Sequence, residues 1–121
     1  MNKDLDEAES LVRRAMKLKP DDGYITDSLG WVLFRQGNYK EAIATLENAY
    51  RLKPDEAIIA EHLGDAYRMY ALRDKARQMY LRAVGLEKDD TNVAKIKQKL
   101  MDLEREMQAG EPSARVPASV R

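Results

Sequence analysis

The chain lacks cysteine and has a single histidine, and each shortage removes a kind of chemistry. Without cysteine it forms no disulfide, uses no thiolate nucleophile and builds no cysteine-based zinc site. Because His62 is the only histidine, the chain by itself cannot form a metal site that needs two histidine ligands. Cysteine-free chains occur in oxidising and in reducing compartments, so this shortage does not fix the location.

Neither sign of charge is in excess, because 21 lysines and arginines face 21 acidic residues. Nucleic-acid-binding domains normally carry a clustered basic excess, so we expect no nucleic-acid partner. No stretch approaches the roughly 18–20 apolar residues of a membrane-spanning helix. The first ten residues, MNKDLDEAES, also lack the apolar core of a secretory signal. The sequence therefore predicts no direct membrane span.

The parts of a catalytic site are also scarce. Six glycines are scattered along the chain, so no glycine-rich phosphate loop is present. His62 lies near Glu61 and Asp65, but no nucleophile follows a recognised motif. The acidic pairs Asp21-Asp22 and Asp89-Asp90 are better explained as helix caps than as metal ligands. We expect no catalytic residue, no metal and no cofactor.

What the chain does contain is an internal repeat of 34 residues. Six pairs of identical residues share this offset: Pro20 and Pro54, Leu29 and Leu63, Gly30 and Gly64, Ala42 and Ala76, Ala49 and Ala83, and Leu52 and Leu86. Each unit holds two amphipathic segments with a break between them. We expect these helices at Tyr24–Gln36, Tyr39–Lys53 and Ala57–Tyr70, then one from the turn at Ala71–Asp74 to Glu87, and a last one at about Asn92–Gln108.

Small residues recur where the two helices of a unit would meet. Gly30 and Gly64 lie on the expected inner face of each first helix. Alanines seven residues apart lie on each second helix: Ala42, Ala49, Ala76 and Ala83. Small side chains let antiparallel helices approach closely, and a bulky residue at Gly30 would cost about 1–3 kcal/mol.

This pattern resembles the tetratricopeptide repeat (TPR) family. The run from Leu29-Gly30 through Gly37-Asn38 to Pro54 matches the family motif, whereas the next unit has Ala71 for Gly37 and Lys88 for Pro54. The resemblance implies an all-α, antiparallel helix-pair solenoid of about six helices. It divides the chain into an incomplete TPR over residues 1–19, TPRs over 23–56 and 57–90, a capping helix over 91–108 and a flexible tail over 109–121.

The first helix resembles the second half of a repeat whose first half is missing. Ala8, Val12 and Ala15 lie 34 residues before Ala42, Leu46 and Ala49. We therefore expect either a piece of a longer repeat protein or a second chain that covers this face. The run Asp27–Leu33 resembles terminal repeats of large bacterial TPR proteins, some of them exported lipoproteins. The location is open: cytoplasmic from this chain, periplasmic or lipoprotein-anchored for a fragment of an exported protein.

Apolar residues of the last segment follow a spacing of three and four: Val93, Ile96, Leu100, Leu103 and Met107. A capping helix, apolar on one side, explains this spacing. A short coiled-coil seam is the alternative.

The resemblance implies a noncatalytic protein-interaction scaffold that binds a peptide or a partner helix in a concave groove lined by first helices. The partner-binding positions would be Tyr24, Asp27, Trp31, Phe34, Arg35, Ile58, Glu61, His62, Asp65, Arg68, Met69, Asn92, Lys95 and Lys99. For Trp31 and Phe34 the alternative is that they pack between repeats, and we favour that alternative for Phe34. Charges of both signs there favour a partner that carries both signs around an apolar anchor. The alternative function is self-association through the first or the last helix.

The resemblance raises the question of whether this chain has the carboxylate clamp of TPR co-chaperones. TPR co-chaperones hold the C-terminal carboxylate of a peptide with a clamp of Lys, Asn, Asn, Lys and Arg. The corresponding positions here are Asp27, Trp31, His62, Lys95 and Ile96 or nearby. Only Lys95 has a suitable charge, so the sequence predicts no binding of heat-shock chaperone tails.

Overall fold

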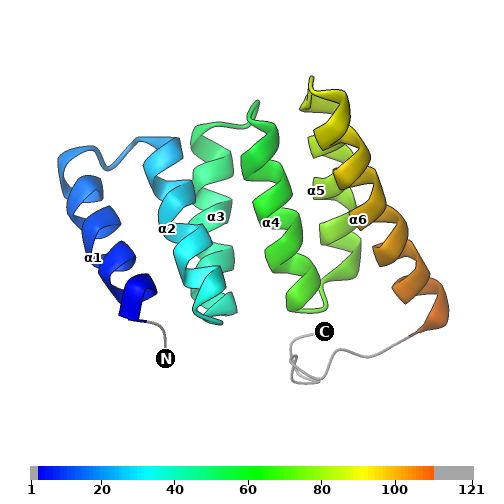
Figure 1. Ribbon diagram of the computed structural model, residues 1–121, viewed down its shortest axis with the longest axis horizontal. Helices are drawn as coiled ribbons and strands as arrows, with labels where there is room; N and C mark the ends of the chain where they lie inside the picture. Colours follow the sequence, from blue (N-terminus) through cyan, green and yellow to red (C-terminus); the bar gives the residue numbers. More distant parts are fainter. Residues whose placement is uncertain (1–2, 111–121) are drawn as a thin grey trace. The chain divides into compact units, whose positions relative to one another are not determined.

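The computed structural model describes residues 3–110, which form six α-helices and no strand (Figure 1). The helices are α1 (Lys3–Leu18), α2 (Gly23–Arg35), α3 (Tyr39–Leu52), α4 (Ala57–Met69), α5 (Arg73–Leu86) and α6 (Asp90–Ala109). The expected all-α class is confirmed, and each expected helix boundary lies within two residues of the observed one. Most of the expected tail, residues 111–121, lies outside the described residues.

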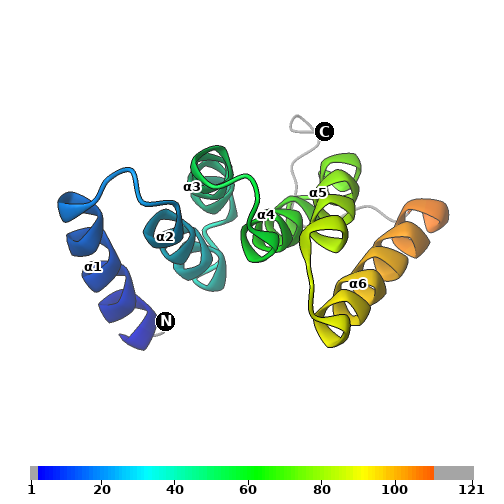
Figure 2. The ribbon, with the colours of Figure 1, turned by 90° about the horizontal axis from the view of Figure 1, so that it is seen from above.

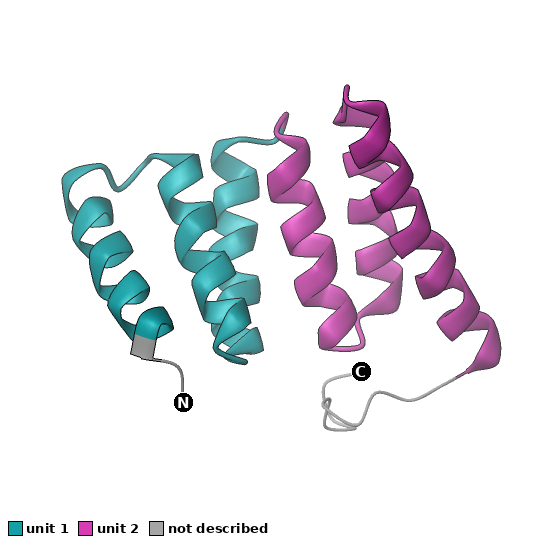
Figure 3. Ribbon diagram, viewed as in Figure 1, with its two compact units in different colours: residues 1–54 teal, residues 55–121 magenta. Residues whose placement is uncertain are grey.

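The helices fall into two compact units, residues 1–54 and residues 55–121 (Figure 3). In the first unit α2 lies between α1 and α3 and packs against both (Figures 1 and 2). In the second unit α5 packs against both α4 and α6. Each unit therefore has one central helix that carries the core contacts.

The turn inside each helix pair has the same backbone geometry in both units. The N–H groups of Gly37 and Asn38 donate to carbonyls three and five residues earlier, both at 2.9 Å. The N–H groups of Ala71 and Leu72 repeat these bonds at 3.0 and 2.9 Å. This ending requires a left-handed residue, with φ of 82° at Gly37 and 58° at Ala71. The alanine therefore adopts a conformation that suits glycine.

Aspartates cap the two helices that begin after an acidic pair. The carboxylate of Asp22 accepts the N–H groups of Tyr24 and Ile25 at 2.9 and 3.0 Å. Asp89 does the same for the first turn of α6, at 2.9 and 3.1 Å. These bonds satisfy backbone donors that a helix start leaves unpaired, as the capping interpretation of the acidic pairs requires.

Glycines allow the close approach within each helix pair. A Cβ atom at Gly30 would lie 2.6 Å from Leu46 Cγ, and one at Gly64 would lie 2.8 Å from the ring of Tyr80. Leu46 and Tyr80 are fully buried, as are the alanines beside them, Ala42, Ala49, Ala76 and Ala83. The small residues therefore serve the packing role expected from the repeat.

The two terminal helices bury their apolar faces to different extents. Val12 and Met16 of α1 pack against the first unit's core, although the repeat offset had placed Val12 on an uncovered face. In α6 Ile96 and Leu103 are buried, while Val93, Leu100 and Met107 are partly buried. The three-and-four stripe of α6 is thus largely covered by its own chain.

Within residues 3–110, no helix combines the length and the apolar character needed to cross a bilayer.

Candidate functional site

Polar side chains join α4 to α6 on one face of the second unit. Lys99 Nζ lies 2.6 Å from a carboxylate oxygen of Glu61 and 3.0 Å from one of Asp65. All three residues were predicted to line a binding groove, and the structure brings them together. The two acidic side chains lie one turn apart on α4, so the ammonium group of α6 reaches both.

Tyr80 of α5 completes this group from the buried side. Its hydroxyl donates a hydrogen bond to Asp65 at 2.6 Å. Burial of the ring, and then the negative charge of Asp65, raise the pKa of Tyr80. Burial alone would lower the pKa of Lys99, but its bonds to Glu61 and the charge of Asp65 outweigh burial and raise it. Tyr80 therefore remains a donor and Lys99 a cation at neutral pH.

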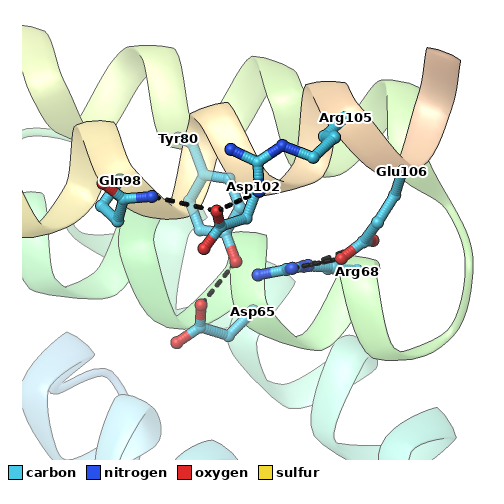
Figure 4. Close-up of polar contacts among 7 residues, drawn as sticks. All are labelled: Asp65, Arg68, Tyr80, Gln98, Asp102, Arg105 and Glu106. Carbon is cyan, nitrogen blue, oxygen red and sulfur yellow. Dashed lines mark hydrogen bonds and ion pairs between the residues drawn. The ribbon is translucent and has the colours of Figure 1, made fainter. Parts of the chain in front are cut away.

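A second polar group lies further along the same helices (Figure 4). Arg68 of α4 pairs with Glu106 of α6 through two guanidinium nitrogens, and this hydrogen bond raises the pKa of Arg68. Asp102 accepts bonds from Gln98 at 3.0 Å and from Arg105 at 3.2 Å. A shallow depression is lined by Arg68, Asp102, Arg105, Glu106 and Ala109. This surface carries both signs of charge.

The first unit presents aromatic side chains instead. The ring of Trp31 stacks on that of Phe34, with centroids 4.8 Å apart and planes 12° apart. Phe34 in turn meets the edge of Tyr39 at 5.4 Å. Trp31 and Phe34 are only partly buried, whereas Leu29 and Leu33 on the same helix are buried. The aromatic pair therefore lies at the border between core and surface.

The remaining predicted positions differ in their exposure. Tyr24 is exposed beneath the Lys53 ammonium, which lies 5.1 Å from the ring centroid. Asp27 is buried, so a ligand has little access to its carboxylate. The exposed positions are Arg35, Ile58, Asn92 and Lys95, and the partly buried ones are His62 and Met69.

Among residues 3–110, no three histidine or acidic side chains gather in a way that could hold a metal ion.

Sequence reasoning missed Glu106, Tyr80 and Asp102 in this group. The 34-residue offset carried a signal for Asp102, which lies 34 residues after Arg68 just as Lys99 lies 34 after Asp65. The expected groove stopped at Lys99 because the motif ends early in the last helix. The hydroxyl bond of the buried Tyr80 depends on a three-dimensional contact that spacing does not show.

A family model described as tetratricopeptide repeat matches residues 33–100. The chain belongs to the tetratricopeptide repeat family. TPR domains are generally noncatalytic interaction modules.

A TPR repeat-containing protein of Pseudomonas aeruginosa is 50% identical to this chain over 36 residues. That match covers 30% of this chain and 6% of the relative's length.

Solved structures share the TPR fold at low identity. The type III secretion translocator chaperone SycD of Yersinia enterocolitica superimposes with a TM-score of 0.80 at 14% identity, covering 87% of this chain and 75% of that one. The first TPR of Spaghetti, bound to the HSP90 peptide SRMEEVD, gives 0.78 at 17% identity and covers 86% and 82%. Both similarities concern the fold, and the second structure holds a peptide.

Proposed function

We propose that this chain is a noncatalytic protein-interaction module that binds an extended peptide or a partner helix. The observation that carries the proposal is the partly exposed pair of Trp31 and Phe34 on α2 of a TPR chain. Tryptophan is among the residues enriched at the centre of binding surfaces, because it offers a large rigid apolar area with a polar edge.

The charged face of the second unit supports the same class of partner. Lys99 and Arg68 supply positive charge, and Glu61, Asp65 and Glu106 supply negative charge on neighbouring helices. A surface with paired charges of both signs favours a polypeptide with mixed charges over a uniformly charged polymer. The even net charge of the chain agrees with this preference.

Trp31 allows a direct test because it is the only tryptophan in the chain. Peptides selected on the native chain from a displayed random library should shift the Trp31 emission on binding. In Trp31→Ala, anisotropy of labelled peptides should show binding weakened by about 30-fold, the loss typical of a central tryptophan.

The matched control is Leu81→Ala, which removes an exposed apolar side chain of α5 in the other unit. This variant should bind the same peptides as the native chain. If the native chain and Trp31→Ala bound the selected peptides equally well, the result would contradict the proposal that α2 binds the peptide.

Self-association is the second candidate function, and one observation favours it. On α1, Leu11 is 61% exposed and Leu18 is 84% exposed. The two leucines are seven residues apart and so lie on one side of the helix, where a second chain would bury both.

A further inference from the structure

The solvent side of α1 carries a stripe in which an acid, a leucine and a base follow one another. Glu7, Leu11, Arg14 and Leu18 are exposed, and their spacing of four, three and four places them on one side of the helix. The opposite side holds Val12 and Met16, which pack against the first unit's core. We call these four exposed residues the α1 stripe.

Neighbouring charges of α1 are engaged within the first unit. Arg13 bonds Glu9 at 2.7 Å and Glu41 of α3 at 3.0 Å. The Gln36 amide donates to Asp6 at 3.2 Å and to Glu9 at 3.0 Å. Bonds from Gln36 and then Arg13 lower the pKa of Glu9.

The charges of the α1 stripe differ from these neighbours. Within residues 3–110, Glu7 and Arg14 form no ion pair or side-chain hydrogen bond. Their charges are therefore available to a second molecule.

We propose that a second copy of this chain packs its α1 antiparallel across the α1 stripe, with the two helices crossing at Leu11. In that register a residue before Leu11 on one copy faces the residue equally far after it on the other. Glu7 then faces Ala15 of the second copy, one residue from Arg14, and Arg14 faces Ala8, one residue from Glu7. Two ion pairs flank the Leu11 contact, and the twofold symmetry repeats every contact.

The order of the charges along the α1 stripe favours an antiparallel second copy of α1 over a parallel one. An acid–leucine–base stripe is complementary to itself only when one helix is reversed. A parallel pair would place Glu7 beside Glu7 and Arg14 beside Arg14, which is unfavourable. The antiparallel pair also sets the two helix dipoles side by side in opposite directions, which is favourable because each N-terminus lies beside the other C-terminus.

Alanines beside the stripe allow the two helices to approach. Ala8 and Ala15 border Leu11 and are partly exposed. The alanines 34 residues later, Ala42 and Ala49, are fully buried under α2. The same residue type at the same repeat position is thus fully buried on α3 and only partly buried on α1.

A single helix crossing predicts a weak dimer. Stable interfaces bury about 1,200–2,000 Å² in total, and one pair of 16-residue helices offers less. Two exposed ion pairs add only about 0.2–1 kcal/mol each and are screened by salt. The dimer should therefore appear at high protein concentration and weaken as salt is added.

Sedimentation equilibrium of the full chain tests the register through charge reversal. Glu7→Arg makes the stripe positive at both ends and Arg14→Glu makes it negative at both ends. Each variant alone should associate about tenfold more weakly or worse, because two attractive pairs become repulsive. An equimolar mixture of the two variants should associate again, since each stripe then faces its opposite.

The matched control is Lys40→Glu, which reverses an exposed charge on α3 and should leave association unchanged. Circular dichroism shows that each variant is folded, and the double variant Glu7→Arg with Arg14→Glu should dimerise like the native chain.

This proposal rests on the second candidate function, self-association. The experiment tests the dimer, the α1 interface and the pairing of charges separately. A native chain that stays monomeric at its highest soluble concentration overturns the dimer itself. A dimer that neither charge reversal weakens overturns the α1 interface. Weakened single variants whose mixture stays monomeric overturn the pairing of Glu7 with Arg14. None of these outcomes bears on peptide binding at α2, which uses other residues.

Discussion

Replacing Ala71 with glycine should stabilise the protein, although it removes a side chain. Ala71 ends α4 with a φ of 58°, in the left-handed region. An L-residue with a Cβ atom pays roughly 1–2 kcal/mol there. The turn fixes this conformation, because the N–H groups of Ala71 and Leu72 donate to carbonyls of the last turn of α4. The strain is therefore present in the native state.

The expected gain is the difference between two effects. Glycine removes the strain of roughly 1–2 kcal/mol. It also makes the unfolded chain more flexible, which costs about 0.4–1 kcal/mol. A net stabilisation of about 0.5–1 kcal/mol follows from these two effects, which for a chain of this size raises the melting temperature by roughly 2–5 °C.

Urea unfolding followed by far-UV circular dichroism measures this change, and two matched variants check the reasoning. Gly37→Ala makes the reverse change at the equivalent turn, where φ is 82°, and should destabilise the protein. Gly85→Ala adds a Cβ atom inside α5, where nothing lies within 4 Å, and should stabilise the helix by about 0.5–1 kcal/mol. An Ala71→Gly variant no more stable than the native chain, together with a neutral Gly37→Ala, would refute the argument.

Two further predictions concern the pH dependence of stability at Tyr80 and the binding of a chaperone tail peptide. The pKa of Tyr80 is raised in the folded chain, so the stability that its proton contributes is complete below the ordinary value of about 10 and is lost as the pH rises above it. Urea titrations at increasing alkaline pH should show this loss, and Tyr80→Phe should make it smaller; an unchanged pH dependence contradicts the role of Tyr80. The peptide SRMEEVD should not bind, because the clamp position at Asp27 is a buried acid and the position at Trp31 is apolar. Measurable binding in calorimetry that Lys95→Ala abolishes would contradict this prediction.

Periodic features of the fold followed from the sequence because each repeats a local requirement. A helix pair must bring Gly30 to Leu46 and Gly64 to Tyr80, so the same spacing recurs and reveals the contact. The capping aspartate Asp22 was equally predictable, since its role depends on the residues that follow it directly. Such features need no knowledge of distant parts of the chain.

Features that depend on a particular neighbour were not predictable in the same way. The repeat offset treated Val12 as a residue waiting for a missing helix, yet Val12 packs on the core that includes Leu29 and Leu33. The leucine left exposed is Leu11, at a position that the motif does not constrain. At Ala71 the sequence shows an ordinary alanine, and only the turn geometry shows its strain.

The ion pairs between α4 and α6 limit what a charged ligand can gain on that face. A ligand carboxylate that approaches Lys99 competes with Glu61 and Asp65, which already hold the ammonium group at 2.6 and 3.0 Å. The exchange replaces one ion pair by another, so its net contribution to affinity is small, although a mismatched charge is penalised. At Trp31 and Phe34, by contrast, the burial of further apolar area on binding adds to affinity directly. The affinity of a peptide bound at α2 should therefore depend mainly on the aromatic pair, whereas the α4–α6 charges should mainly select among ligands of their own face.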